Sequence, residues 1–450
     1  MTFSHSSLQK HIEEKLYNKR RKRALWLKRR NLNKYLGGSK CNINYNELYP
    51  GRIIRFIPLT IKLFIKKGYL STKYASKKIV VPSIFSFKDH YDETIVFFKS
   101  LISSYLLLKG NLTLDFSKCK SASISAFVQL GILLDEFNIA LQRYNKGCVH
   151  RNGKHIKIIP ASDIKILKYL ASLNIYVSPK LEELDKSDMY LPLRLQRGRR
   201  KGVYSENQKG VVGKRMVDFV NEALRANSYE LNRAGQTVFR GLIDEVLSNA
   251  EDHSINYSEW FVNGIAFRER QFGTDIVELN FAIVNYGDSM YEGFEKTKEL
   301  NKANYDLVNT GFQWHQKSLS RKHCFGNEGL YTMLMLNEGI SRLKYEESSR
   351  GNGTMNFLDA FITIGGFGDD DKKFNSQLNI ISGHTCLTCD NNVRPYDSGS
   401  MKLISLNRKQ DQRLLPDNDY LVDNQEYFPG TILECRIYLN ETYFNRKLNL

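Results

Sequence analysis

One amphipathic segment near the middle of the chain limits the folds that this sequence can adopt. In residues 241–253, Glu245, Asn249 and His253 follow one another at intervals of four, so all three project from one face of a helix. Apolar residues occupy the positions between them, namely Leu242, Val246, Leu247 and Ala250. Such a stripe predicts that the helix packs against a sheet and leaves the acid, the amide and the imidazole facing a cleft.

The polar face of this helix has a specific chemical use. A carboxylate beside an amide can orient a water molecule and bind hydrated Mg²⁺, because Mg²⁺ prefers oxygen ligands and keeps several of its waters. An isolated acid and amide at this spacing more often form a solvated helix face. The choice between the two interpretations therefore depends on the segments that follow in the chain.

The positive charge of the chain is concentrated at its beginning. Residues 1–80 hold twenty Lys or Arg against three Glu, a balance of +17 out of a formal net charge of +18. Ten of these cations fall between Lys15 and Lys34, in a segment over residues 10–34 with helix-forming composition. This basic arm predicts an anionic partner, which is nucleic acid, an acidic patch of a protein or an anionic membrane surface.

Cysteine content and hydropathy predict a cytoplasmic protein. The seven cysteines are scattered and odd in number, which argues against a disulfide framework. No membrane span is expected, since no run approaches the roughly twenty apolar residues that are needed, and the polar start lacks a signal-peptide core. Cys386 and Cys389 have metal-like spacing, but they lack a second pair and fall in an expected strand, so a zinc site is not favoured.

Periodicity predicts an α/β (α+β) chain with several parts. After the basic region at 1–80, residues 82–195 alternate strands and helices as a small α/β domain. An Arg-rich and Gly-rich stretch predicts a linker over 196–213, and residues 214–440 form a second domain. The expected strands are 111–116, 155–160, 174–177, 260–267, 277–284, 377–381 and 431–439, and the expected helices are 124–144, 162–173, 216–227, 234–253 and 354–364.

The order of elements in the second domain resembles the GHKL ATPase fold, a two-layer α/β sandwich shared by gyrase B, heat-shock chaperones, histidine kinases and MutL. The segment from Glu245 to His253 resembles the N-box of that family. The resemblance implies that Asn249 binds Mg²⁺ and nucleotide, and that Glu245 activates the attacking water or hydroxyl. His253 lies one turn further on, where it either contacts phosphate or only ends the helix.

Residues 284–290 occupy the place of the family's D-x-G-x-G turn, whose aspartate accepts a hydrogen bond from the adenine amino group. This chain has Asn285 at the aspartate position, Gly287 at the first glycine and Ser289 at the second. Asn285 can still accept through its amide oxygen. Asp288 is a second candidate acceptor, displaced by three residues.

Two further segments resemble the phosphate side of a GHKL pocket. Residues 349–354 resemble the second glycine box, in which Gly351, Gly353 and Thr354 would cradle phosphates and Arg350 would add a bidentate contact. Thr431 follows Gly430 in a segment similar to the family's closing strand, where the threonine hydroxyl lies near the nucleotide. The interval 291–350 corresponds to the mobile lid, with Gly326, Gly329 and Gly339 as candidate hinges or helix caps.

The domain at 82–195 is similar to STAS-type domains. The matching piece runs from Leu114 to Ser125, where a strand ending in D-x-S precedes a helix. The resemblance implies that Ser121, Ser123 or Ser125 accepts a phosphoryl group, although serines at such a position commonly cap the helix.

Together these features predict an ATP-binding, Mg²⁺-dependent GHKL-type ATPase module that acts as an intracellular signalling or conformational switch. Three alternatives stay open: an anti-sigma-type serine protein kinase that acts on an STAS domain, a MORC-like ATPase associated with nucleic acid, and a catalytically degenerate interaction protein. Homodimerisation is compatible with each of them.

Overall fold

The computed structural model describes most of the chain beyond the basic arm. The described residues are 57–108, 110–146, 155–173, 190–199, 204–225, 229–253, 259–271, 274–320, 322–337, 340, 355, 357–358, 376–390, 392–398 and 401–440. The basic arm at 10–34, the expected strand at 174–177 and the second glycine box at 349–354 lie outside them.

The chain divides into two compact units, each assembled from several stretches of sequence. One unit holds the described residues up to Val80 together with Val96–Asp115 and Leu133–Ile159, and the other holds Val81–Ile95, Phe116–Ile132 and Pro160–Leu450. The division passes through α3 (Tyr91–Leu107) and α4 (Ile124–Lys146), so each of these helices contributes residues to both units.

The smaller unit contains a parallel sheet in the order β1-β3-β5, formed by β1 (Lys78–Val80), β3 (Leu112–Asp115) and β5 (Ile156–Ile159). It also holds α2 (Leu59–Lys66) and the short 3₁₀ helix η3 (Thr72–Tyr74). Its halves of α3 and α4 meet where the rings of Tyr105 and Phe137 stack with centroids 4.0 Å apart. Parallel strands joined through helices are expected from the alternating pattern of this region.

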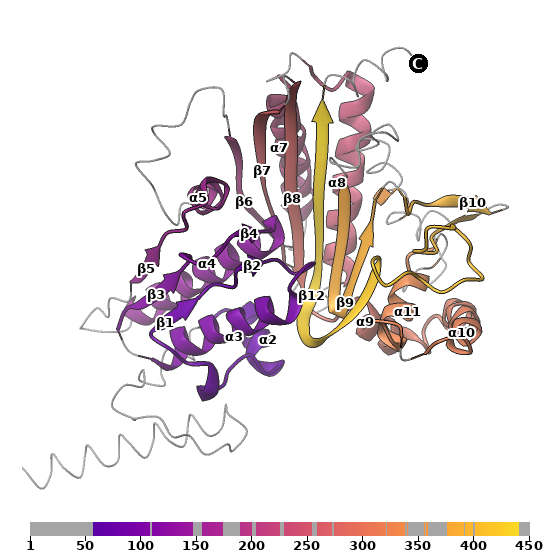
Figure 1. Ribbon diagram of the computed structural model, residues 1–450, viewed down its shortest axis with the longest axis horizontal. Helices are drawn as coiled ribbons and strands as arrows, with labels where there is room; N and C mark the ends of the chain where they lie inside the picture. Colours follow the sequence, from indigo (N-terminus) through magenta and orange to yellow (C-terminus); the bar gives the residue numbers. More distant parts are fainter. Residues whose placement is uncertain are drawn as a thin grey trace, which may run out of the picture. The chain divides into compact units, whose positions relative to one another are not determined.

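The larger unit is built on a five-stranded antiparallel sheet in the order β6-β7-β8-β12-β9 (Figure 1). Its strands are β6 (Tyr190–Arg199), β7 (Glu259–Gln271), β8 (Thr274–Tyr286), β12 (Leu421–Asn440) and β9 (Gln377–Cys389). Two long helices, α7 (Tyr204–Arg225) and α8 (Arg233–His253), pack against each other and against one face of the sheet, which we call the inner face.

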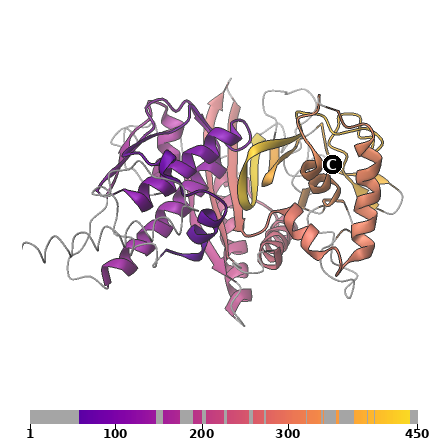
Figure 2. The same ribbon diagram turned by 90° about the horizontal axis from the view of Figure 1, so that it is seen from below.

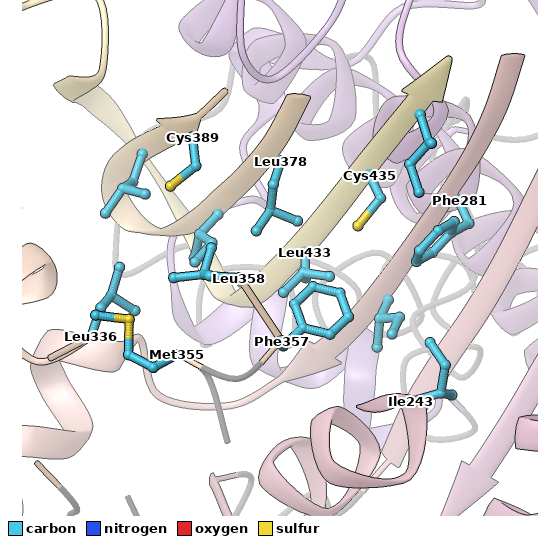
Figure 3. Packing of buried hydrophobic residues seen from close by; sticks show 14 of the residues in the cluster. Ile243, Phe281, Leu336, Met355, Phe357, Leu358, Leu378, Cys389, Leu433 and Cys435 are labelled. Carbon is cyan, nitrogen blue, oxygen red and sulfur yellow. The ribbon is translucent and has the colours of Figure 1, made fainter. Parts of the chain in front are cut away.

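The inner face is apolar because alternate residues of each strand point to it. Its core includes Val262, Leu279, Phe281, Ile283, Leu378, Ile380, Leu433, Cys435 and Ile437. Figure 3 shows Phe281, Leu433 and Leu378 packed in one cluster with Ile243 of α8. In α8 the fully buried positions are Ile243 and Leu247, whereas Leu242 and Val246 are only half-buried, so the apolar stripe is rotated slightly from the expected one.

Residues from the first half of the chain cover the opposite face, which we call the outer face, within the same unit. These residues come from α5 (Ile164–Ser172), from the first turns of α3 and α4, and from the parallel pair β2 (Ile84–Phe85) and β4 (Ser121–Ala122). The Tyr286 hydroxyl donates to Gln129 Oε1 over 2.6 Å, and the ring of Phe87 meets that of Phe428 edge to face. The sheet is therefore buried on both faces.

Three shorter helices occupy the region expected to form a lid. They are α9 (Met290–Thr297), α10 (Lys302–Gln316) and α11 (Asn327–Leu334), and α9 and α11 contact β9. Figure 2 shows this group in orange beside the yellow strands, and the small hairpin β10 (Tyr396–Ser398) and β11 (Met401–Leu403) follows β9 in the chain. Among the expected residues 354–364, only 355, 357 and 358 are described, and they are helical.

The chain is thus a mixed α/β protein with parallel and antiparallel sheets, as expected for the fold class. The expected strands and helices that fall on described residues are confirmed, most of them with longer bounds. The linker over 196–213 is wrong. Residues up to Arg199 belong to the edge strand β6, where exposed arginines are tolerated and Arg197 pairs with Glu259 at 2.9 Å, and α7 begins at Tyr204. The expected domains 82–195 and 214–440 stay predictions.

One described helix is long and apolar enough to cross a membrane. The stretch Ile124–Arg143 of α4 passes that test by length and composition, but 67% of its most apolar window is buried inside the protein. A core helix has the same composition, so this is weak evidence for a membrane span.

Candidate functional site

A row of polar residues crosses one end of the inner face. Asn285 on β8 lies directly opposite Trp260 on β7 and opposite Thr431 on β12, and Thr431 in turn lies opposite Ser382 on β9. Directly opposed residues in an antiparallel sheet point to the same face, so these four side chains form a continuous row. We call Asn285, Thr431 and Ser382 the polar row. The sheet thus brings Asn285 and Thr431 together, as the resemblance implies.

Helix α8 reaches the same end of the sheet. Glu251, in the last turns of α8, accepts a 3.0 Å hydrogen bond from Trp260 Nε1 and pairs with Lys209 of α7 at 3.2 Å. Because Trp260 is the strand partner of Asn285, this contact places the α8 turn that carries Asn249 near the polar row. Gly198 on β6 makes room for the indole, since a Cβ there would lie 1.9 Å from the ring.

The candidate residues Glu245 and Asn249 differ in environment. Asn249 is half-buried, and Glu245, one turn earlier, is exposed to solvent. Neighbouring Asp244 faces α7 instead, where a Cβ on Gly213 would lie 2.8 Å from its Oδ1. Burial raises the pKa of Asp244, and Arg240 acts in the opposite direction. His253 ends α8, but its side chain lies outside the described residues.

The turn after β8 depends on glycine. Gly287 has a φ of 151° and donates its N–H to the carbonyl of Pro429 over 3.4 Å. Across from it, Gly430 has a φ of 135°, and a Cβ there would lie 2.1 Å from the carbonyl oxygen of Asn285. Only glycine fits this close approach of β12 to β8. Glycine is therefore required at position 430 by the close packing of β12 on β8, whether or not the neighbouring Thr431 contacts a ligand.

The structure accounts for two departures from the family's glycine turn. Ser289, at the second glycine position, is the N-cap of α9, where its hydroxyl accepts from the Glu292 N–H and Glu292 accepts from the Ser289 N–H. Asp288 pairs with Lys296 in the last turn of α9, at 2.5 Å. That ion pair occupies the carboxylate of Asp288 and leaves Asn285 as the better placed candidate acceptor.

The start of α11 contains the candidate hinge glycines Gly326 and Gly329. Both donate their N–H groups to Asp423 Oδ2, at 2.8 and 3.0 Å. A Cβ on Gly329 would lie 2.8 Å from Asp423 Oδ1, so this glycine allows the carboxylate to reach the helix N-terminus. Burial raises the pKa of neighbouring Glu328, which accepts from the His384 N–H. Gly326 and Gly329 thus act as a helix start, and Gly339 lies outside the described residues.

The candidate phosphoacceptor serines lie at the start of α4. Ser121 is exposed, whereas Ser123 and Ser125 are buried and their hydroxyl oxygens are 2.9 Å apart. The Ser125 N–H donates to Glu434 Oε2 of β12 over 3.2 Å. A phosphoryl donor can reach Ser121 directly, but it can reach Ser123 and Ser125 only if this contact opens.

Several predicted site residues are not described. Arg350, Gly351, Gly353 and Thr354, which would hold phosphates, lie outside the described residues. In the part of the chain that is described, no group of three His, Cys, Asp or Glu side chains is placed to hold a metal ion. Cys386 and Cys389 are both buried in β9, and burial raises the pKa of the Cys386 thiol to about 12.

Sequence reasoning missed Ser382 and Glu251 as parts of this region. Ser382 sits in an apolar strand and has no motif of its own, and its place becomes visible only when β9 pairs with β12. Glu251 lies within residues 241–253. The available signal was Trp260 a few residues later, because an indole N–H needs a hydrogen-bond acceptor when it is buried.

Comparison with protein-family models, curated proteins and solved structures found no match to this chain.

Proposed function

We propose that the larger unit is an ATP-binding, Mg²⁺-dependent GHKL-type module that acts as a cytoplasmic signalling or conformational switch. In the same proposal, residues 82–195 form an STAS-like domain, and the basic arm at 10–34 recruits an anionic partner. The observation that carries it is the polar row, which lies at the end of the inner face reached by the Asn249 turn of α8. Two motifs that are 36 residues apart in sequence, at 249 and 285, are therefore carried by elements that reach the same end of the sheet.

The proposed roles follow from phosphoryl-transfer chemistry, which depends on positioning and charge neutralisation more than on covalent catalysis. Asn249 would hold Mg²⁺ through its amide oxygen, and Glu245 would orient the attacking water. The solvent exposure of Glu245 supports this role, because an attacking water must reach it. Asn285 and Thr431 would contact the base, and the phosphates would lie toward 350–354. Bound Mg²⁺ would supply charge neutralisation of the β- and γ-phosphate oxygens.

The kinase alternative keeps one supporting observation. Ser121 is exposed at the first position of β4, so an ATP-bound copy of the protein can approach it. Transfer to Ser121 would appear as radiolabel from γ-labelled ATP on the protein, and the label would be lost in Ser121→Ala. Release of free phosphate alone would favour the ATPase.

The proposal is tested by calorimetric titration of the full chain with ATP and Mg²⁺. We expect Asn249→Ala to weaken Mg²⁺-dependent binding about tenfold or more, because an oxygen ligand of the metal is lost. Glu245→Ala should keep binding and lose turnover. Glu222→Ala, which removes an exposed glutamate from α7, is the matched control and should change neither.

Two results would contradict the proposal. Absence of ATP binding by the wild type would favour the degenerate interaction protein, and unchanged turnover in Glu245→Ala would exclude the general-base role. Repeating the titration with duplex DNA or RNA at two salt concentrations tests the MORC-like alternative, which predicts binding that weakens steeply with salt.

A further inference from the structure

A chain of hydrogen bonds links the polar row to the start of α9. The Met290 N–H donates to Ser382 Oγ over 2.8 Å, and Ser382 Oγ donates to the carbonyl oxygen of Gly430 over 3.1 Å. Ser382 Oγ also lies 2.9 Å from Thr431 Oγ1. Ser382 is only 1% exposed, so these contacts replace water for its hydroxyl. One buried hydroxyl thus joins β9, β12 and the first turn of α9.

Counting protons shows which direction of the Ser382–Thr431 bond lets every contact of Ser382 form. A serine hydroxyl has one proton and two acceptor lone pairs. A carbonyl oxygen can only accept, so the Ser382 proton is used by Gly430. The Met290 N–H takes one acceptor position of Ser382 Oγ, and the other is left for a donor. The arrangement that uses all three contacts at once therefore has the Thr431 hydroxyl donating to Ser382.

When the Thr431 hydroxyl donates to Ser382, the polar row offers hydrogen-bond acceptors, and not a donor, to a ligand at this point. In that arrangement the remaining lone pairs of Thr431 Oγ1 can only accept a hydrogen bond, and Thr431 is half-buried. Beside it, Asn285 is 7% exposed, and within the described residues its amide makes no hydrogen bond. The amide oxygen of Asn285 can supply a second acceptor. A ligand that donates at this point, such as an amino group, satisfies both oxygens.

We propose that Ser382 is the positioning residue that sets base selectivity at this site. By holding the Thr431 proton, it makes the row favour a purine with an amino group at its six-position over one with an oxo group there. The inference rests on the proposed nucleotide site. It also explains how a chain with asparagine in place of the family's aspartate retains an acceptor that discriminates between bases.

The test measures selectivity rather than affinity alone. The full chain is titrated with ATP, with inosine triphosphate, which carries an oxo group at position six, and with purine riboside triphosphate, which lacks the amino group. We expect Ser382→Ala to reduce the preference for ATP over inosine triphosphate by roughly fivefold, the effect of one net hydrogen bond, because the freed Thr431 proton can now donate to the oxo group. Ser382→Thr keeps the hydroxyl and should keep the preference.

Two controls separate selectivity from folding. Thr388→Val removes another buried hydroxyl from β9, one that donates to Asn379, and should leave the ratio unchanged. Should Ser382→Ala fail to fold, Thr431→Val removes the acceptor directly, and the preference for ATP over purine riboside triphosphate should fall by a similar factor. An unchanged ratio in the folded variant overturns the role of Ser382. Failure of the wild type to bind any of the three nucleotides overturns the proposed function instead.

Discussion

The two faces of the five-stranded sheet treat buried polar groups differently. On the outer face, Glu434 accepts from Asn379 Nδ2 and from the Ser125 N–H, and Lys165 pairs with Glu278 at 2.6 Å. These partners come from the chain itself. On the inner face, the Asn285 amide has no partner among the described residues, and it lies beside a half-buried threonine hydroxyl.

This difference separates buried polar groups that stabilise the fold from those that are candidates to bind a ligand. A buried polar group that has its partners stabilises one arrangement of the chain, and its loss leaves the partner unpaired. A buried polar group with free capacity beside a half-buried hydroxyl is a candidate contact for a ligand. Unpaired atoms also occur on the outer side, at Asn263 Oδ1 and Gln129 Nε2, but these are isolated and fully buried.

The largest effect should come from the residue that anchors α8 to the sheet. Trp260→Ala removes a fully buried side chain and leaves Glu251 without its indole partner, so we expect a loss of about 3–5 kcal/mol in the free energy of unfolding. Urea denaturation measures it. Trp314→Ala is the control, because Trp314 is 60% exposed, and it should change stability by less than about 0.5 kcal/mol.

Glu434 tests whether the outer face is structural. Glu434→Ala leaves Asn379 Nδ2 and the Ser125 N–H without their partner, so we expect a loss of about 1–3 kcal/mol in the free energy of unfolding. ATP affinity, measured below the unfolding transition, should stay the same. A clear loss of affinity without a loss of stability would contradict the division between the two faces.

Substitution of Asn285 tests the inner face, where we expect ATP affinity to change more than stability. Asn285→Leu removes an amide without a described partner, so stability should change by less than about 1 kcal/mol while ATP affinity falls about tenfold. Asn280→Leu is the matched control on the same strand. Asn280 is buried on the outer face and donates to Glu278, so this variant should lose stability and keep ATP affinity.

Substitution of Asp244 should give the smallest effect, which is a change in the pH dependence of the free energy of unfolding. Burial raises the pKa of Asp244 above its ordinary value of 3.8, so its contribution to stability is fully present below that value and is lost as pH rises through the folded pKa. Compared with wild type, Asp244→Asn should therefore gain relative stability as pH rises above 3.8. Unfolding curves at several pH values measure the difference, and an opposite slope would contradict it.

Periodicity alone located most of the elements. Long amphipathic helices such as α4 and α8, and apolar strands such as β7 and β8, carry patterns that no loop would have. Helix α3 was missed because its apolar residues surround the helix, which leaves no clear stripe. The edge strand β6 was missed because its arginines resemble a linker, whereas an edge strand accepts charge along its open side.

The sequence by itself determined the candidate residues on α8 and in the glycine turn, because local spacing decides which side chains share a helix face or flank a turn. It could not decide that Thr431 and Ser382 lie beside Asn285, since strand register is a long-range property that depends on packing of the whole sheet. Nor could it show that Met290, Gly430 and Thr431 all meet the hydroxyl of Ser382. Only the tertiary structure closes that chain of donors and acceptors.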